Sequence, residues 1–403
     1  MNPQIQTSST AVPTIGQRLA DSARETARSV GAVRIPELLL GTLLIVEAGF
    51  GLPVGVNQIA MIALIGLAVA QRPQRELSIP DWVYAAFVIG LFYIAMISLF
   101  ADPSEFAADW KRRLIRLMLT SLVVLVVASG RIDIRSLLVG VGAGLFANTV
   151  LFYAGLAPDT YGGVLSGYLE DKNVAGLAYA VYGILLLSLT QKLSWRILII
   201  AAAAVGVWLT GSRTSIAAFG AALIWVLLAP RLVPLLRAAL AGILYWVTQI
   251  LAEDYSRIGR FSSREGSDLL RSRIDAASQL KVEDTGFWGA GLGEAYVEIE
   301  DRTWYFHNSY WSALVEGGWL WLTLVLILTI GIGLSLVRGG RISREIAIGQ
   351  GAILVLLLCS FRLGEVLFTL PWAVALGYCL RHQLIPVRSR SDVATRHREE
   401  VAR

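Results

Sequence analysis

Long apolar stretches separated by short polar connections form the main pattern along the chain. About 20 apolar residues are needed to cross a hydrocarbon core of about 30 Å, and a helix satisfies its own backbone groups there. Stretches of suitable length, bounded by Arg, Pro or Gly, predict twelve membrane-spanning helices. They lie near residues 36–50, 54–70, 81–100, 114–129, 136–156, 174–190, 196–210, 214–229, 232–251, 309–337, 345–361 and 365–381.

One long polar segment, residues 251–308, interrupts this pattern. Five apolar residues within it recur at helical spacing: Leu269, Leu270, Ile274, Ala277 and Leu280. This spacing predicts an amphipathic helix at the membrane surface. We therefore expect an all-α integral membrane protein, with a single polytopic domain over residues 36–381 and one long external loop. A mostly lipid-embedded chain has few places for water-facing chemistry, so function is sought first in this loop.

The composition agrees with a membrane protein. Hydrophobic residues make up 55% of the chain and charged residues 16%, against about 25% charged residues in soluble domains. Residues 1–35 lack the apolar core of a signal peptide, so we expect a flexible cytoplasmic tail there and a second, basic tail over residues 382–403. Cys359 and Cys379 fall inside predicted spans, where cysteine usually packs as a small apolar residue. No disulfide framework, metal site or cofactor is indicated.

Positive charge predicts the orientation, because Lys and Arg next to a span resist translocation. If the N-terminus is inside, most of the 35 Lys and Arg residues fall in inner segments. Many of the others lie in the segment 251–308, and long loops escape this rule. We therefore expect both termini in the cytoplasm and the long loop outside.

A group of basic residues departs from this orientation, because it falls at the outer end of the fourth span. It consists of Lys111, Arg112, Arg113 and Arg116. One interpretation is neutralisation by the acidic stretch 102–109 together with contacts to lipid headgroups. The other is an anion site for a lipid diphosphate.

Two short polar motifs lie at the outer ends of spans, "EDKN" at 170–173 and "GSRTS" at 211–215. Each can be explained by helix capping, with Asn173, Ser212 or Thr214 as the cap. Arg213 is harder to explain in this way, because an Arg in a tight turn between apolar spans is costly unless it faces a polar cavity or a partner.

The external loop carries further candidates. Arg271 and Arg273 flank the apolar face of its predicted helix, and both can be explained by lipid headgroups or solvent. "GFWGAGLG" at 286–293 permits a tight turn or a close backbone approach to a ligand. His307 is the one histidine expected outside, where it can accept a proton or simply begin a helix. Glu316 lies inside the tenth predicted span, and a buried acid there is expected to pair with another group.

The order of "EDKN", "GSRTS", a loop Arg, "GAGLG" and "HNSYWSALVEGG" resembles the superfamily of O-antigen ligases and O-antigen and exopolysaccharide polymerases. The resemblance covers roughly residues 165–320. It implies a GT-C-like, metal-independent glycosyltransferase of the bacterial inner membrane, with its active site outside the cytoplasm. Its donor would be an undecaprenyl-diphosphate-linked glycan and its acceptor a glycan hydroxyl. A chain-length regulator and a flippase are further implied partners, and no nucleic acid is expected.

The motifs of the superfamily can be carried over residue by residue. They assign catalysis to Arg213, Arg273 and His307, with Arg271 as the alternative loop arginine. Residues expected to bind substrate are Arg271, Lys172, Asn173, Asn308, Lys111, Arg112, Arg113 and Arg116. The chemistry suits these residue types, because a diphosphate leaving group needs fixed positive charge and His307 can accept or orient the proton of an attacking hydroxyl. Direct displacement would invert the anomeric centre.

Within this superfamily, Lys172 and Asn173 resemble the polymerases more than the lipid A ligases. A secondary transporter is the main alternative from another class. Against it, the link over residues 191–196 is short, the halves share no obvious motif, and the polar candidates lie at the outer face instead of the midplane. A non-catalytic envelope protein would leave Arg213 and His307 unexplained.

Overall fold

The computed structural model describes residues 33–73, 77–253, 265–335 and 340–384. Most of the two expected tails and the loop segment 254–264, which includes Arg257 and Arg260, lie outside the described residues.

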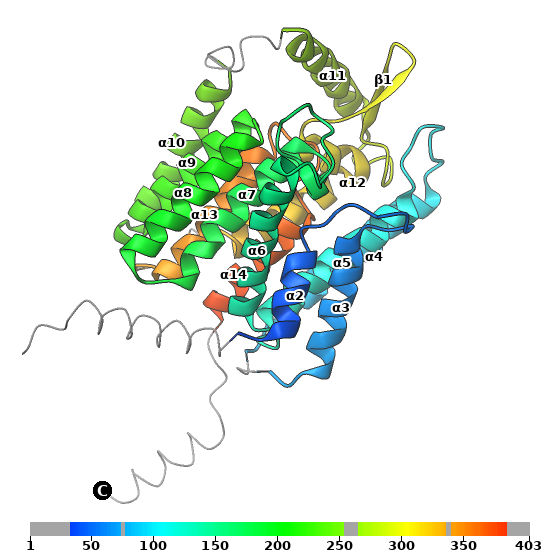
Figure 1. The fold of residues 1–403 in the computed structure, drawn as a ribbon. Coiled ribbons are helices and arrows are strands. Elements are labelled where there is room, and N and C mark those ends of the chain that lie inside the picture. The colour runs from blue at the N-terminus through cyan, green and yellow to red at the C-terminus, as the bar shows by residue number, and fades with distance from the viewer. Residues whose placement is uncertain (1–32, 74–76, 254–264, 336–339, 385–403) are drawn as a thin grey trace, which may run out of the picture.

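Helices occupy each of the segments predicted from the hydrophobic pattern, with shifted ends (Figure 1). In the first half they are α2 (Ile35–Leu43), α3 (Val56–Ala70), α4 (Asp81–Phe100), α5 (Trp110–Ala128), α6 (Ile134–Tyr153) and α7 (Lys172–Leu186). In the second half they are α8 (Leu193–Leu209), α9 (Arg213–Leu228), α10 (Pro234–Glu253), α12 (Ser309–Leu326), α13 (Arg344–Cys359) and α14 (Leu370–Gln383). A π-helical segment, Ile327–Ile332, continues α12.

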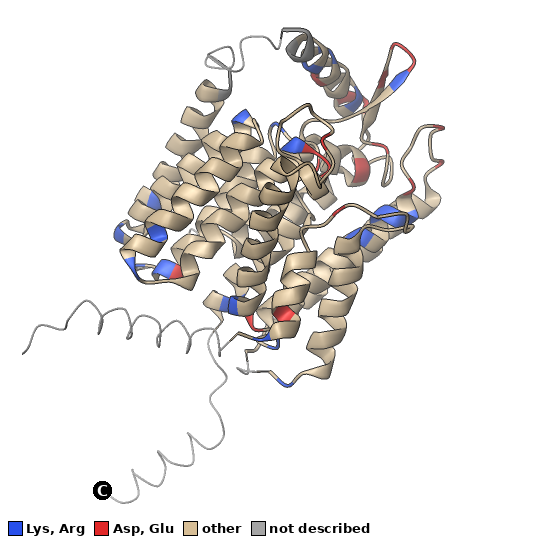
Figure 2. Cartoon of the chain, in the orientation of Figure 1, with Lys and Arg blue, Asp and Glu red and all other residues tan. Residues whose placement is uncertain are grey.

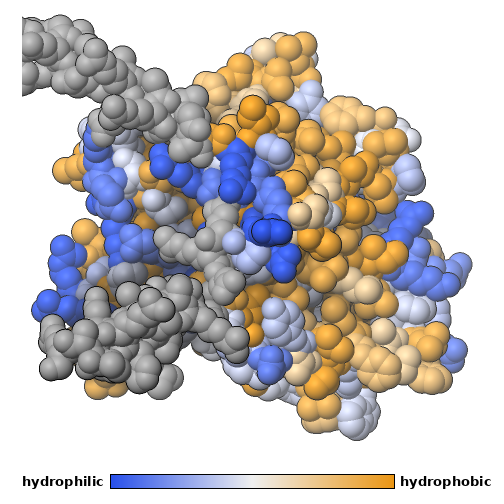
Figure 3. All heavy atoms as spheres, turned by 90° about the horizontal axis from the view of Figure 1, so that it is seen from below, coloured by the Kyte–Doolittle hydropathy of each residue, from blue (hydrophilic) through white to orange (hydrophobic). Residues whose placement is uncertain are grey.

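Among the described residues, six helical stretches are long and apolar enough to cross a membrane. They are α4, α6, α7 continued to Leu189, α9 continued to Arg231, α10, and α12 continued to Ile332. The charged residues lie mainly toward the two ends of the bundle, with a mostly uncharged middle (Figure 2). Viewed from below, hydrophobic side chains border the hydrophilic ones (Figure 3). The chain is therefore a mostly helical membrane protein, and the span count of twelve stays a prediction.

The centre of the bundle is formed by α7, α13 and α14, which are apolar on all sides. Every residue of α7 from Ala175 to Leu185 is buried, and α13 packs between α7 and α9. A helix that is hydrophobic around its whole circumference belongs in the interior, surrounded by other helices. Cys359 and Cys379 are buried in this centre.

The long polar loop forms a small layer over one end of the bundle, called here the loop end (Figure 1). It contains α11 (Glu265–Asp284) and an antiparallel hairpin of β1 (Tyr296–Ile299) and β2 (Arg302–Tyr305). This hairpin departs from the all-α prediction. Its turn residues, Glu300 and Asp301, both have positive φ, as a two-residue hairpin turn requires. They lack the Asn-Gly or Asp-Gly pattern that predicts such a turn from sequence.

The predicted loop helix is confirmed, but its apolar face differs in part. Ile274 is buried in a second small core with Ala295, Val297, Phe306 and Val315. Leu270 and Ala277 pack against this core. The other two predicted members, Leu269 and Leu280, are 66% and 68% exposed. The helix therefore packs on the hairpin and the start of α12 through a narrow stripe.

Candidate functional site: a charged cavity at the loop end

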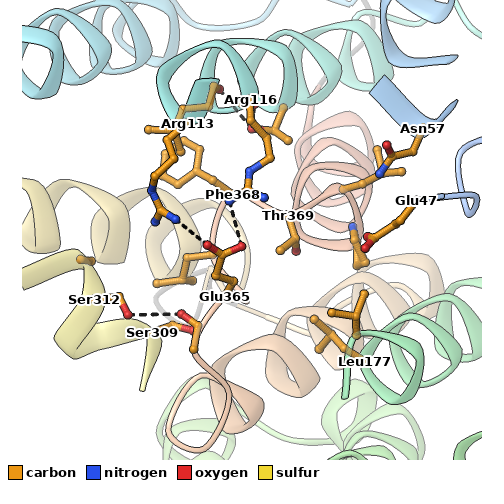
Figure 4. A pocket seen from close by; sticks show the side chains of 18 of the residues that line it. Glu47, Asn57, Arg113, Arg116, Leu177, Ser309, Ser312, Glu365, Phe368 and Thr369 are labelled. Carbon is orange, nitrogen blue, oxygen red and sulfur yellow. Dashed lines mark hydrogen bonds and ion pairs between the residues drawn. The ribbon is translucent and has the colours of Figure 1, made fainter. Parts of the chain in front are cut away.

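The starts of α3, α5, α7, α12 and α14 surround a cavity of about 230 Å³ at the loop end of the bundle. The connections that precede α3 and α14 complete its wall. Its polar lining consists of Glu47, Asn57, Gln58, Arg113, Arg116, Thr120, Glu170, Ser309, Ser312, Glu316, Glu365 and Thr369, several of which are labelled in Figure 4. Segments far apart in the sequence therefore contribute to one polar space between apolar helices.

Arg113 links two carboxylates in the wall of this cavity. Its guanidinium lies 2.7 Å from Glu316 and 2.6 Å from Glu365, and Arg116 lies 2.8 Å from the other oxygen of Glu365 (Figure 4 shows the contacts of Glu365). Burial alone would raise the pKa of the Glu365 carboxyl, but Arg116 and Arg113 outweigh it and hold that pKa at about 2. The predicted pairing of Glu316 is confirmed, and its partner is Arg113.

The basic group at 111–116 divides between two environments. Arg113 and Arg116 turn into the cavity, whereas Lys111 and Arg112 are exposed. Asp109 caps α5 by accepting from the backbone of Lys111 at 2.9 Å, and its carboxylate lies 3.5 Å from Arg112. Neutralisation by the acidic stretch 102–109 therefore applies to the exposed side, while Glu316 and Glu365 neutralise the arginines of the cavity.

Glu316 precedes a break in α12. Gly318 has φ +66° and ψ −167° inside the helix, and the backbone of Gly291 and Gly293 donates to the backbone oxygen and side chain of Glu316, each at 2.9 Å. A Cβ on Gly318 would lie 2.0 Å from the backbone oxygen of Phe287. The close approach that the "GAGLG" glycines permit is therefore toward α12 of the same chain, where they position Glu316.

The motif at 170–173 places Glu170 in the cavity wall and uses the next residue as the helix cap. Asp171 accepts from the backbone of Asn173 at 2.7 Å and of Val174 at 3.1 Å, so Asp171 caps α7 instead of Asn173. The ammonium of Lys172 lies 5.0 Å from the ring centre of Tyr161. Neither Lys172 nor Asn173 lines the cavity.

The motif at 211–215 begins α9 beside α7. Ser212, Thr214 and Ser215 are buried, and the hydroxyls of Ser212 and Ser215 are 2.9 Å apart. Ser212 occupies the N-cap position, although its side chain makes no capping hydrogen bond. A Cβ on Gly176 of α7 would lie 2.7 Å from Ser212 Cβ, so the two helix starts touch. This contact brings Arg213, which is half-buried, to the loop end of the bundle.

His307 lies on the loop side of the connection between α13 and α14. Its Nδ1 is 3.6 Å from Asp275 of α11, and its side chain is 32% exposed. A Cβ on Gly364 would lie 1.8 Å from the backbone oxygen of Phe306, so this connection presses against the chain just before His307. Asn308 caps α12 by accepting from the backbone of Tyr310 at 3.0 Å. Gly364 and Ser309 line the cavity, whereas His307 is not among the cavity-lining residues.

The two loop arginines point to different partners. Arg271 donates to the backbone oxygen of Arg362 at 2.6 Å, in the same connection between α13 and α14. Arg273 pairs with Glu300 at the hairpin turn at 2.8 Å, and its side chain is 49% exposed. Arg271 is therefore the loop arginine nearer to the bundle.

Sequence reasoning did not single out Glu47 and Glu365, although a signal existed for each. Glu47 falls inside the predicted span 36–50, and Glu365 begins the predicted span 365–381. An ionisable residue inside an apolar segment marks a functional site by default. In the structure, both carboxylates line the cavity from connections outside the helices.

No protein-family model matches the chain, and no curated protein matches it.

Proposed function

We propose that this protein is a bacterial surface polysaccharide polymerase. It would transfer glycan repeat units from undecaprenyl diphosphate to an acceptor sugar hydroxyl at the outer face of the inner membrane. The observation that carries this proposal is that the motifs at 170–173, 211–215 and 307–318 meet at the loop end of the bundle, where Glu170, Ser309 and Glu316 line one charged cavity. The resemblance of these motifs to the polymerase and ligase superfamily supports the reaction type.

In this proposal, positive charge around the external loop receives the diphosphate. A departing diphosphate needs donors that stay charged, which Arg provides at any physiological pH. We assign this role to Arg213 and Arg271. His307, whose Nδ1 lies 3.6 Å from Asp275, would orient the attacking hydroxyl. Arg271 is preferred to Arg273 because it contacts the connection between α13 and α14, whereas Arg273 pairs with the exposed hairpin turn.

An apolar groove supports a lipid-linked donor. It has a volume of about 420 Å³ and lies between α10, α12 and α13, lined mainly by Leu, Ile and aromatic side chains. Asn308, the neighbour of His307, forms part of its wall together with Tyr245, Tyr310 and Phe361. A polyprenyl chain in this groove would bring its diphosphate to the loop end.

Two alternative functions differ from the proposed polymerase in specific ways. An O-antigen ligase would use the same donor and differ in its acceptor, a lipid A core, and the pair Lys172–Asn173 favours the polymerase. A secondary transporter would bind its solute near the membrane midplane. Here the cavity gathers helix starts and connections at one end of the bundle, which favours the glycosyltransferase.

Separate Ala substitutions at Arg213, Arg271, Arg273 and His307 test the proposal, with Arg302→Ala on the exposed edge of the hairpin as the control. Long chains should fall by about 100-fold for Arg213, Arg271 and His307, because each substitution removes either positive charge at the departing diphosphate or the imidazole that orients the attacking hydroxyl. Arg273→Ala and Arg302→Ala should polymerise normally. The measurement is surface polysaccharide length on gels, in a deletion strain complemented with each variant.

The product that accumulates decides between the candidates. A polymerase without activity leaves single repeat units on the lipid carrier, whereas a ligase without activity leaves long chains on it. Normal polysaccharide in all stable, membrane-inserted variants would refute the catalytic assignment. Counterflow of a labelled solute in vesicles would instead identify a transporter.

A further inference from the structure

The charge balance of the cavity disfavours an anion. Four carboxylates line it, those of Glu47, Glu170, Glu316 and Glu365, against the two guanidiniums of Arg113 and Arg116. Both guanidiniums are already paired with carboxylates at 2.6–2.8 Å. A diphosphate or a uronic acid placed here would meet uncompensated negative charge. The interpretation of the basic group at 111–116 as a diphosphate site is therefore not favoured.

The opposite wall of the cavity offers hydrogen-bonding groups that have no partner among the described residues. In the described part of the chain, the carboxylates of Glu47 and Glu170 and the amide of Asn57 make no hydrogen bond or ion pair. Figure 4 shows Glu47 and Asn57 across the cavity from Arg113 and Arg116. A carboxylate accepts hydrogen bonds and an amide both donates and accepts them, so these groups suit the hydroxyls of a neutral ligand.

An aromatic surface completes the cavity. Trp321 and Phe368 both line it, and their rings stack with centroids 5.2 Å apart and planes 16° from parallel. An aromatic ring provides a rigid apolar surface that can cover the C–H face of a sugar. The hydroxyls of Ser309, Ser312 and Thr369 add polar contacts at the edge.

We propose that this cavity is the acceptor site, that it takes one uncharged sugar ring, and that Glu47 accepts the proton of the attacking hydroxyl. The inference rests on the proposed function and deepens it. The cavity is small enough for a single sugar ring, because its volume of about 230 Å³ is below the roughly 300–1,000 Å³ of pockets for drug-sized ligands.

The step is a single displacement. The acceptor oxygen forms a bond to the anomeric carbon of the donor, its proton passes to the Glu47 carboxylate, and the bond from that carbon to the diphosphate oxygen breaks. The electron pair leaves with the polyprenyl diphosphate, whose new charge is received by the cationic groups of the external loop. Glu47 then releases its proton to water.

The surroundings of Glu47 suit a proton acceptor. Burial raises the pKa of its carboxyl to about 7, Arg116 opposes this, and Glu170, Glu365 and Asp171 add to it. A base with a pKa near the working pH is the most effective one. Transfer should therefore increase as the pH rises through about 7, since Glu47 ionises there.

Polymer formation in membranes tests the role of Glu47. Glu47→Gln keeps the shape of the side chain and should lower the rate by about 100-fold or more, with loss of the pH-dependent increase near neutrality. Glu47→Asp should restore part of the rate and part of the pH-dependent increase. Glu298→Gln, on the exposed part of β1, should match the wild type. If Glu47→Gln keeps the wild-type rate and pH profile while His307→Ala is inactive, the acceptor-site inference fails and the proposed function stands.

Ligand protection tests the cavity without catalysis. Both native cysteines are buried, so Asn57→Cys gives a purified protein with one reactive thiol in the cavity wall. Methyl glycosides of neutral hexoses should slow its reaction with a maleimide, whereas methyl glucuronide and inorganic diphosphate should not. Ser272→Cys on the exposed side of α11 should react equally in all cases. Protection by diphosphate or glucuronide, or by no sugar, would overturn the inference.

Discussion

At the scale of single residues, Arg113 joins two acids that are distant in the sequence. Glu316 is on α12 and Glu365 precedes α14, and both lie within 2.7 Å of its guanidinium. Glu316 is almost fully buried, with 7% of its side chain exposed. Such pairs contribute little to stability when compared with apolar packing, but removing one partner leaves the other as an uncompensated buried charge. The arginine therefore fixes the relative position of α5, α12 and α14 at the cavity.

This contact predicts a specific mutational cycle. Arg113→Leu should destabilise the protein by about 3–5 kcal/mol, because it leaves Glu316 buried and unpaired. The double substitution Arg113→Leu with Glu316→Leu should recover most of this loss. Lys111→Ala, on the exposed side of α5, serves as the control. Thermal unfolding in detergent measures the cycle, and additive losses in the double variant would contradict the pairing.

At the scale of elements, α2 and α6 meet through glycines. A Cβ on Gly140 of α6 would lie 2.0 Å from the backbone oxygen of Leu38, and one on Gly41 of α2 would lie 2.3 Å from that of Leu137. Thr42 donates to the backbone oxygen of Gly140 at 3.0 Å. Small residues allow helix backbones to approach closely in a membrane, where burial away from lipid provides little driving force.

This packing predicts that Gly140→Ala separates the two helices and lowers stability by at least about 1–3 kcal/mol, as for an overpacked core. Gly66→Ala in α3 is the matched control, because nothing lies within 4 Å of its Cβ position. It should leave stability equal or slightly higher, since Ala favours the helix over Gly. Equal melting temperatures for the two variants would show that α2 and α6 do not meet in this way.

At the scale of the whole molecule, the starts of alternate helices gather at the loop end, as expected for a chain that crosses back and forth. The positive-inside rule predicts that this end lies outside. In intact cells, an impermeant thiol reagent should therefore label Ser272→Cys on α11. It should label Lys192→Cys, between α7 and α8, only after the membrane is opened. The native cysteines are buried, so background labelling should be low. The reverse pattern would invert the orientation and exclude an external active site.

The local features predicted from the sequence are those set by neighbouring residues. Hydrophobic stretches of membrane length produced helices at the expected positions, and apolar spacing over 267–280 produced α11. The hairpin was missed because its strands have four residues each and its turn lacks the usual glycine. The N-cap residues observed differ from those predicted by one or two positions, because several adjacent polar residues can cap a helix equally well. Asp171, which caps α7 in place of Asn173, is an example.

The sequence by itself determined that this protein is helical and embedded in a membrane, because hydrophobic length and helical periodicity are properties of contiguous residues. It also indicated that Glu316 needs a partner, because an acid in an apolar span is costly alone. Only the tertiary structure decided that the partner is Arg113, that Arg271 and Arg273 point to different neighbours, and that Glu47 faces a cavity. Those contacts join residues far apart in the chain, and packing in three dimensions alone selects them.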